Sequence, residues 1–490
     1  MLNPPATMRA GECMTVFEAY KSSIESSIRT LPPRVARAWT TPTLPYHNAW
    51  SLHRWGRVAM AVDFEQLVAD DYTWVSRQAF RDPEIHAAEQ ERIFKRCWMF
   101  LGHESQVREP GDFFTTYMGE EAVIVTRGLD GALHALVNSC RHRGMRVCRA
   151  DRGNTKRFSC PYHSWTYNAN GELIGVPRRK EGYYDEIDLS KNGLIQAAQV
   201  DSYKGLIFAT FDASAPSLLD YLGDMAWYMD CVIDREGGTE LIPGIHKWIV
   251  RANWKLACDN NAGDWYHVAF AHGSSARLNQ NPNQFDEDDN RLQISAETGH
   301  TLCAYRYNAG KQWMGAQQQP RILTEYLEET AASRAKLLGP DKGRVHFIAG
   351  NVFPNFGWIP GSYTIRQYHP RGPFQTEVWS YCLVDAAAPR EVKDAMKRMY
   401  TNSFGPSGLL EQDDGENWTG CAASSNKPVM GRESFNYQMG VGHEWNIPGI
   451  PGQHVGRATS EVVQRSFYRR WLEQMTGTSE PVLRVIAREG

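Results

Sequence analysis

The sequence predicts an α+β protein in which a small all-β domain precedes a larger domain of antiparallel strands and helices. Two observations support this fold class. From Gly102 to about Phe211, short alternating apolar runs lie between Gly, Asp and Asn turns, as expected of a small β domain. From Ser217 onward, amphipathic helical segments mix with strand-like runs, which favours an antiparallel sheet with helices on one side.

Composition is that of an ordinary globular protein. The 490 residues are 42% hydrophobic and 22% charged, with a net charge of −3, which gives no general attraction to nucleic acid or to anionic membranes. The chain lacks an apolar run of about 18 residues and an apolar secretory signal, so we expect no membrane span. The ten cysteines lack disulfide-framework spacing, and we therefore expect a reducing, cytoplasmic location.

We expect four segments along the chain. Residues 1–59 form an N-terminal extension, expected to be poorly ordered, because Met60 begins a stretch typical of a natural chain start. Residues 60–101 are expected to be helices that pack on the larger domain, since "DPEIHAAEQERIFKRCWMFLG" begins at Asp-Pro and has helical apolar spacing. The β domain occupies residues 102–213 and the larger domain residues 214–490.

Within these segments the individual elements follow from turn residues and periodicity. "LDGAL" and "NANGEL" predict hairpin turns centred on Asp-Gly and Asn-Gly. The stretch 217–233 predicts one amphipathic helix, and a further helix is expected from Arg390 to Ser403. Three apolar stretches, 345–359, 361–373 and 376–386, predict successive strands.

Two Cys-His pairs in the β domain indicate a metal site. Cys140 and His142 form C-x-H, and Cys160 and His163 form C-x₂-H. The same ligand types hold structural zinc, or a [2Fe–2S] cluster with two Cys on one iron and two His on the other. The cluster is favoured because each Cys is paired with its own His. Around the pairs, Gly144 and Pro161 allow close backbone approach and Trp165 could shield one side.

A second constellation lies in "NWKLACDNNAGDWYHVAFAHGSS", which contains Asp264, His267 and His272. Two His and one carboxylate make the facial triad of non-haem Fe(II) oxygenases. On a straight helix Asp264 and His267 share a face, but His272 lies about 140° from His267. A π-bulge or a helix end is therefore expected between the two His residues, with Gly273 as a suitable stop. The alternative is that this stretch is core and its His residues merely line it.

The third ligand of this second site must come from elsewhere in the chain. The segment "LLEQDDGENW" offers four carboxylates, and the residues alone do not choose among them: Glu411, Asp413, Asp414 and Glu416.

The loops "CRHRG" and "CPYHSW" resemble the two cluster loops of Rieske proteins, with Ser164 at a position where Gly is usual. From Met60 onward the chain resembles the large (α) subunit of aromatic-ring-hydroxylating dioxygenases, most closely the biphenyl, toluene and phenylpropionate branch. The matching blocks include "NWKLACDNNAGDWYHVAFAH", "HPRGP" and "FGPSGLLEQDDGENW". The resemblance implies an all-β Rieske [2Fe–2S] domain ahead of a helix-grip-like catalytic domain.

The resemblance also implies residue roles. It makes His267, His272 and Asp414 the iron ligands. Asp264 would bridge an iron-ligand His to a cluster His of the neighbouring subunit, and Asn260 would lie near the iron. At the next position this family usually has Phe, so Asn261 either meets a polar substrate group or points away and packs. The implied substrate pocket contains Asn261, Val268, Phe404 and Leu410.

As a whole, the resemblance implies the terminal oxygenase of an aromatic catabolic system. It would use O₂ and electrons from NAD(P)H, delivered by a reductase and/or a ferredoxin, to cis-dihydroxylate an aromatic ring. A small β subunit in an α₃β₃ assembly, or an α₃ homotrimer, is expected, and neither nucleic acid nor membrane is a partner. The alternatives are a Rieske monooxygenase or demethylase of an aromatic substrate, and a pure Rieske electron-transfer protein.

Overall fold

The computed structural model describes residues 62–274, 290–306 and 320–477. The expected N-terminal extension, residues 1–59, lies outside this part of the chain. Among the helices in the described ranges, none combines the length and apolar character needed to cross a membrane.

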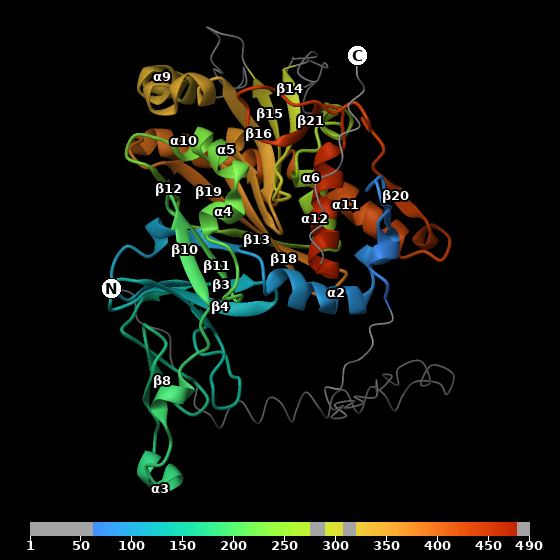
Figure 1. The fold of residues 1–490 in the computed structure, drawn as a ribbon. Coiled ribbons are helices and arrows are strands. Elements are labelled where there is room, and N and C mark those ends of the chain that lie inside the picture. The colour runs from blue at the N-terminus through green and yellow to red at the C-terminus, as the bar shows by residue number, and fades with distance from the viewer. Residues whose placement is uncertain (1–61, 275–289, 307–319, 478–490) are drawn as a thin grey trace, which may run out of the picture. The chain divides into compact units, whose positions relative to one another are not determined.

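The β domain consists of three small antiparallel sheets (Figure 1). Their strand orders are β5-β4-β3-β6, β7-β8-β9 and β10-β11-β2. The fold class predicted for this part of the chain is therefore confirmed. The strands are β2 (Met99–His103), β3 (Asp112–Met118), β4 (Glu121–Arg127), β5 (Leu133–Val137), β6 (Arg152–Asn154), β7 (Arg157–Ser159), β8 (Thr166–Asn168), β9 (Leu173–Gly175), β10 (Gln199–Tyr203) and β11 (Leu206–Thr210).

The two hairpins predicted in this domain are present. Gly131 follows Asp130 in the turn between β4 and β5, and Gly171 follows Asn170 in the turn between β8 and β9. Both glycines have positive φ, 79° and 86°. At Gly171 a side chain is also excluded sterically, because a Cβ would lie 2.7 Å from a methyl group of Leu136. Glycine is therefore required for conformation and for space.

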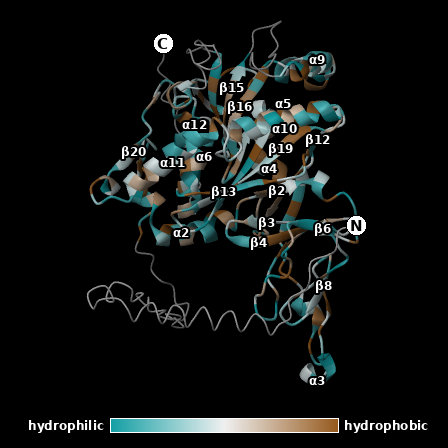
Figure 2. Cartoon of the chain, turned by 180° about the vertical axis from the view of Figure 1, so that it is seen from behind, coloured by the Kyte–Doolittle hydropathy of each residue, from teal (hydrophilic) through white to brown (hydrophobic). Residues whose placement is uncertain are grey.

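The larger domain is built on a nine-stranded antiparallel sheet with the order β12-β19-β18-β17-β16-β15-β14-β21, in which β13 also pairs with β19. Figure 2 shows apolar residues along β19 and along β2 of the β domain, and both strands are largely buried. The strands are β12 (Thr239–Leu241), β13 (His246–Val250), β14 (Arg291–Ser295), β15 (Thr301–Arg306), β16 (Val345–Val352), β17 (Phe356–Ile359), β18 (Thr364–Pro370), β19 (Thr376–Asp385) and β21 (Gln453–Arg457).

Helices cover both faces of this sheet, so the expectation of helices on one side was wrong, and α6, α11 and α12 lie next to one another (Figure 1). The expected helix at residues 390–403 is confirmed as α10. The helices are α2 (Pro83–Glu89), α3 (Arg179–Tyr183), α4 (Leu218–Leu222), α5 (Asp224–Ile233), α6 (Trp254–Asn261), α7 (Val268–Ala271), α9 (Arg321–Lys342), α10 (Arg390–Phe404), α11 (Glu411–Ser425) and α12 (Val462–Thr476).

Two expectations about single elements were wrong in detail. The helix expected at 217–233 is divided into α4 and α5 at Gly223, whose φ of 49° and ψ of −132° are not helical. The strand expected at 345–359 is two strands, β16 and β17, with a cis Phe353–Pro354 peptide between them. Apolar periodicity did not reveal either break, because the residues before and after each break are buried and the apolar pattern continues across it.

The segment 60–101 was expected to be helical, but only part of it is. Asp82 caps α2 and Pro83 occupies its first turn, as the sequence predicted. The helix continues as a π-helical turn, Gln90–Phe94, and then ends. The flanking residues instead form strands: β1 (Trp74–Ser76) pairs with β20 (Ser434–Asn436), and β2 joins the β domain. Pairing with distant strands decides these conformations, and a local pattern does not contain that information.

Glu89, the last residue of α2, joins three helices at a fully buried point. Its carboxylate accepts hydrogen bonds from the indole N–H groups of Trp254 and Trp471, each at 2.8 Å, and from the Lys255 ammonium. Burial lowers the pKa of Lys255, and the Glu89 carboxylate opposes that shift. The cluster fixes α6, which carries Trp254 and Lys255, against α2 and α12.

We predict that Glu89→Gln strongly destabilises the protein. It leaves Lys255 as a buried charge without a counter-ion, a loss that costs about 3–5 kcal/mol. The matched control is Glu91→Gln two residues later, because Glu91 is 70% exposed in its ion pair with Lys95. Urea unfolding followed by tryptophan fluorescence should give a much lower midpoint for Glu89→Gln and an unchanged one for Glu91→Gln. Equal midpoints would contradict a structural role for the cluster.

Candidate metal centres

His267, His272 and Asp414 converge on a single point in the larger domain. The His267 Nε2 and His272 Nε2 atoms are 3.2 Å apart, and they lie 3.2 Å and 3.3 Å from Asp414 Oδ1. Donors about 2.1 Å from a shared metal ion lie roughly 3.0–3.4 Å apart at octahedral or tetrahedral angles. The three atoms therefore have the spacing of one side of a metal coordination sphere.

The backbone between the two His residues contains the helix end that the sequence predicted, because helix α7 ends at Ala271, directly before His272. An additional break, which the sequence did not predict, lies before both His residues at Gly263, where φ is 125°. Helix α6 has already ended at Asn261, and His267 and His272 flank the short helix α7 at its two ends. A Cβ at Gly263 would lie 2.7 Å from the Cys303 backbone nitrogen, so only glycine permits this approach to β15. The two imidazoles therefore lie at the ends of one short helix, with their Nε2 atoms 3.2 Å apart.

Each imidazole has a carboxylate behind it. The Nδ1 atom of His267 lies 3.4 Å from Asp264 Oδ2 and 3.3 Å from the amide nitrogen of Asn260. The Nδ1 atom of His272 lies 3.0 Å from Asp413 Oδ2. A carboxylate at Nδ1 keeps the proton there and leaves the Nε2 lone pair directed at the shared point. Sequence reasoning considered Asp413 only as a possible third ligand and missed its contact with His272.

The charges at this site favour a cation. Burial lowers the pKa of His267, but Asp264 and Asp414 outweigh burial and raise it to about 10. Burial raises the pKa of Asp414, but the two imidazoles outweigh burial and lower it to about 2. The buried Asp414 Oδ1 atom has no well-aligned hydrogen-bond donor. The protein side chains therefore fit a bound metal ion, which would replace protons that the carboxylates otherwise hold on the imidazoles.

Helix α11, which carries Asp413 and Asp414, is held in place by a buried ion pair. Arg366 of β18 donates to the Glu411 carboxylate in the first turn of α11 and to the Phe404 carbonyl at the end of α10. Both charged groups are almost completely buried. Of the four candidate carboxylates, Glu411 thus pairs with arginine, whereas Asp413 and Asp414 face the imidazoles.

Four residues were expected to form a substrate pocket, and their surroundings differ: Asn261, Val268, Phe404 and Leu410. Asn261 is buried, and its side-chain amide donates to the Gly350 carbonyl of β16 at 2.6 Å. Of the two alternatives for Asn261, its placement favours packing on the sheet. Val268 and Leu410 are half-buried next to His267 and α11. The Phe404 ring lies against the Arg366 guanidinium, whose Cζ atom is 5.1 Å from the centre of the ring.

The two Cys-His loops of the β domain have matching backbone geometry. In the first loop, Cys140 N donates to Met145 O and Gly144 N to Cys140 O. In the second, Cys160 N donates to Trp165 O and Ser164 N to Cys160 O. Gly144 and Ser164, at equivalent positions, both have positive φ, 72° and 57°. The departure at Ser164 therefore falls where the backbone favours glycine.

The four side chains of these loops suit a cluster better than one ion. Both cysteines are buried, and the rings of His142 and His163 are half-exposed with their centres 4.5 Å apart. In the described ranges, only His267, His272 and Asp414 form a set of ligand atoms all within 4.8 Å of one another. Tetrahedral zinc places all four of its ligand atoms within about 4 Å of one another, so the wider loop arrangement favours the [2Fe–2S] alternative.

Two aromatic residues complete the loop site. Trp165 stacks on His142 at 5.0 Å with an angle of 8° between the planes, and so shields one side as expected. The buried Tyr167 hydroxyl lies 3.3 Å from Cys140 Sγ and accepts from the Arg141 backbone N–H. Burial raises the pKa of Tyr167, so the hydroxyl keeps a proton that it can donate to a thiolate. Sequence reasoning missed Tyr167, whose only signal was its place two residues after Trp165.

Comparison with known proteins assigns both domains. Residues 97–203 match the Rieske [2Fe-2S] domain, and residues 218–477 match the catalytic domain of the ring hydroxylating alpha subunit. The benzene 1,2-dioxygenase subunit alpha of Pseudomonas putida is 38% identical over 84% of this chain and 94% of its own. The biphenyl 2,3-dioxygenase subunit alpha of Rhodococcus jostii (strain RHA1) is 37% identical over 84% and 91%.

Two further comparisons bear on fold and function. A structure of naphthalene 1,2-dioxygenase with indole bound in the active site superposes with a TM-score of 0.79, at 30% identity, over 85% of this chain and 95% of that one. The N,N-dimethyl phenylurea N-demethylase subunit alpha of a Sphingobium strain is 32% identical over 81% and 90%. The chain therefore belongs to the ring-hydroxylating dioxygenase alpha subunits, terminal oxygenases that carry a Rieske [2Fe–2S] cluster and a mononuclear iron.

Proposed function

We propose that this chain cis-dihydroxylates an aromatic ring, with O₂ and NAD(P)H-derived electrons as co-substrates. The observation that carries the proposal is the set of three ligand atoms 3.2–3.3 Å apart, each imidazole backed by a carboxylate. We assign the iron to His267, His272 and Asp414, and the cluster to Cys140, His142, Cys160 and His163. When bound, the cluster supplies single electrons and the iron offers open positions for O₂ and substrate.

In this proposal the protein residues position and protect the chemistry. Asp264 and Asp413 hold the Nδ1 protons of the two imidazoles and fix the orientation of the rings. Arg366 and Glu411 set the position of α11, and so of Asp414. Val268, Phe404 and Leu410 provide apolar surface that excludes water around an aromatic substrate.

We further propose that Asp264 connects the iron site to the cluster of a second copy of the chain. The Asp264 side chain is 25% exposed, so it can contact another protein while it remains next to His267. The nearby Tyr266 and Phe270 are 48% and 73% exposed, which is unusual for aromatic residues beside a buried site. On the cluster side, Tyr162 is 57% exposed beside His163. These surfaces support an α₃ arrangement, alone or with a small β subunit.

The cluster loops also supply a surface suited to an acidic electron donor. Asp151 is the one acidic residue in the stretch 138–165, which contains both cluster loops, and its carboxylate pairs with Lys247 at 3.3 Å. We propose that a ferredoxin or reductase binds here through complementary charge, in the reducing cytoplasm that the free described cysteines favour. The exposed basic residues are Arg141, Arg143, Arg146, Arg149, Arg152, Lys156 and Arg157.

A second candidate function is oxidative N-demethylation or monooxygenation of an aromatic compound. The 32% identity to a phenylurea N-demethylase subunit favours keeping this candidate, because such an enzyme would share every proposed ligand.

We predict that labelled oxygen separates these two functions. With ¹⁸O₂, a compatible electron-transfer chain and a panel of arenes, mass spectrometry should find both oxygen atoms in a cis-dihydrodiol. Incorporation of one atom only, or formaldehyde release from an N-methyl substrate with no diol from any arene, would instead establish the second candidate.

His267→Ala should remove the mononuclear iron and leave the cluster intact. Iron content should fall from about three to about two atoms per chain, while the visible absorbance of the cluster is retained and product formation is lost. The control is His443→Ala, since His443 is exposed and belongs to neither centre. Three irons in the His267→Ala protein would show that this imidazole is not a ligand.

Asp264→Asn should preserve both metal centres and slow electron delivery. After chemical reduction, oxidation of the cluster by O₂ and substrate should be about 10- to 100-fold slower by stopped-flow absorbance, with iron content unchanged. Asp413→Asn is the matched control, because Asp413 contacts the other imidazole and lies off the proposed route. Its cluster should be oxidised at the normal rate per iron bound. Normal oxidation in Asp264→Asn would reject the bridging role.

A further inference from the structure

A small cavity lies on the sheet face that is turned away from the iron site. Trp358, Ile365 and Tyr381 are opposite one another on β17, β18 and β19, so they share one face, and Leu383 shares it two residues later. Trp358 and Leu383 line the cavity. Gly357, the neighbour of Trp358, faces the other way, where a Cβ would lie 2.6 Å from the side chain of Asn261 in α6.

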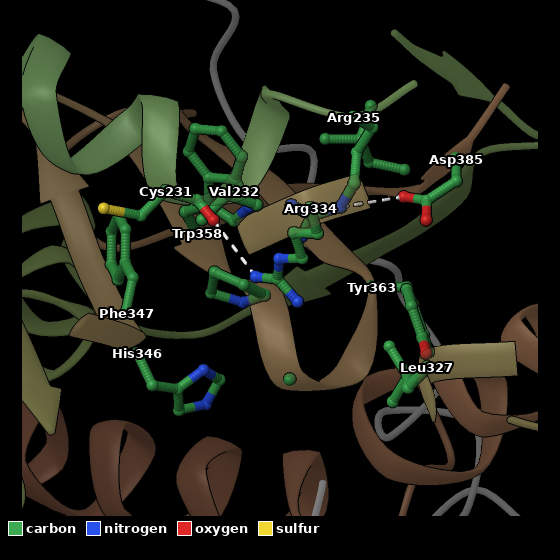
Figure 3. A pocket seen from close by; sticks show the side chains of 13 residues that line it. Cys231, Val232, Arg235, Leu327, Arg334, His346, Phe347, Trp358, Tyr363 and Asp385 are labelled. Carbon is green, nitrogen blue, oxygen red and sulfur yellow. Dashed lines mark hydrogen bonds and ion pairs between the residues drawn. The ribbon is translucent and has the colours of Figure 1, made fainter. Parts of the chain in front are cut away.

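The cavity contains one more positive charge than negative charge. Both oxygens of the Asp385 carboxylate have partners: Oδ1 accepts from Arg235 Nε at 3.1 Å and Oδ2 from the Tyr326 hydroxyl at 3.2 Å. Arg334 of α9 has no such partner. Its guanidinium donates to the Cys231 carbonyl at 3.1 Å, and no carboxylate of the described chain forms an ion pair with it. Figure 3 shows Arg334 amid the lining residues, with Arg235 directed at Asp385 instead.

The other titratable groups that face the cavity do not change this balance. Burial, together with Arg334 and Arg235, lowers the pKa of His346 to about 3, so its ring is neutral. Burial raises the pKa of Cys231 to about 12 and also raises that of Tyr363, so both stay protonated. Burial and Arg235 lower the pKa of Arg334 to about 10, which leaves it charged at neutral pH.

The volume and the lining of the cavity limit which ion could neutralise Arg334. The cavity volume is about 50 Å³, room for roughly four water molecules. Its walls are mainly apolar and aromatic, from Val232, Leu327, Phe347, Trp358 and Leu383. A guanidinium binds the planar carboxylate group in a bidentate manner, and an apolar wall suits a short alkyl group.

We propose that this cavity is a binding site for a small monocarboxylate, of about the size of acetate, held by Arg334. The site is separate from both metal centres, since none of their proposed ligands lines it. The bound anion would supply the counter-charge that Arg334 lacks among the described residues, and it would join α9 to α5 and to the sheet. Binding of a carboxylate at this site does not depend on the proposed oxygenase activity.

The test uses acetate as the probe and the intact protein. Saturation-transfer NMR of the acetate methyl group should show saturable binding that equimolar chloride does not displace. In Arg334→Met the affinity should fall by at least about tenfold. The matched control is Lys336→Met, an exposed cation on the same helix, which should bind acetate as the original chain does. Equal affinity in all three proteins, or full displacement by chloride, would overturn the proposal.

Two further measurements keep the test independent of folding. In chloride buffer without acetate, Arg334→Met should melt no lower than the original chain, because the substitution removes a partly buried charge that forms no ion pair with a described carboxylate. A markedly lower Tm in that buffer would mean that Arg334 is already neutralised within the protein. Leu327→Trp, which fills the cavity and keeps Arg334, should also abolish acetate binding, and binding that persists would reject this location.

Discussion

The shared point of His267, His272 and Asp414 lies within a group of carboxylates whose excess of negative charge favours a bound cation. Asp264, Asp413 and Asp414 surround two imidazoles, so even two protonated rings leave one negative charge uncompensated. Burial lowers the pKa of His267, but the carboxylates of Asp264 and Asp414 raise it to about 10, in keeping with this excess of negative charge. Metal and protons compete for the same Nε2 atoms, so metal binding must release protons and strengthen with pH.

Such a site persists only because the surrounding fold fixes each of its parts from a distance. Glu89 holds α6 through Lys255 and two indoles, while Arg366 holds α11 through Glu411. Gly263 lets the chain turn against β15 between α6 and His267. None of these contacts touches the shared point. Helix α11 carries Asp414, however, and α6 carries Asn260, which contacts His267. These contacts therefore contribute to the geometry of the site. They belong to a framework that is distinct from the residues that could bind metal.

The parts of the site that sequence could predict are those defined by residue type and local spacing. Cys140-x-His142 and Cys160-x₂-His163 are local patterns, and so are the Gly-centred hairpins of the β domain. The additional break at Gly263 could not be predicted, because glycine is required there by the approach to Cys303 on another strand. The different roles of Asp413 and Asp414 could not be predicted from local sequence either, because they depend on which imidazole nitrogen each carboxylate contacts.

The same limitation applies to residues whose role depends on a neighbour far away in sequence. Asn261 differs from the aromatic residue usual in the family, which suggested a polar substrate contact, but its amide is already bonded to the Gly350 carbonyl. Tyr167 had no pattern that marked it, yet its hydroxyl is next to the sulfur of Cys140. A residue type therefore narrows what a side chain can do, and its partners decide which of those roles it takes.

The two faces of the large sheet show how closely unrelated chemistries can lie together. Gly357 and Trp358 are adjacent in β17, but the first contacts α6 beside the iron site and the second lines the cavity with Arg334. On the iron side Arg366 is neutralised by Glu411, whereas on the other side Arg334 has no carboxylate among the described residues. The alternation of a single strand is enough to keep an excess of negative charge and an excess of positive charge apart. Each face can then bind an ion of the opposite sign without neutralising the other.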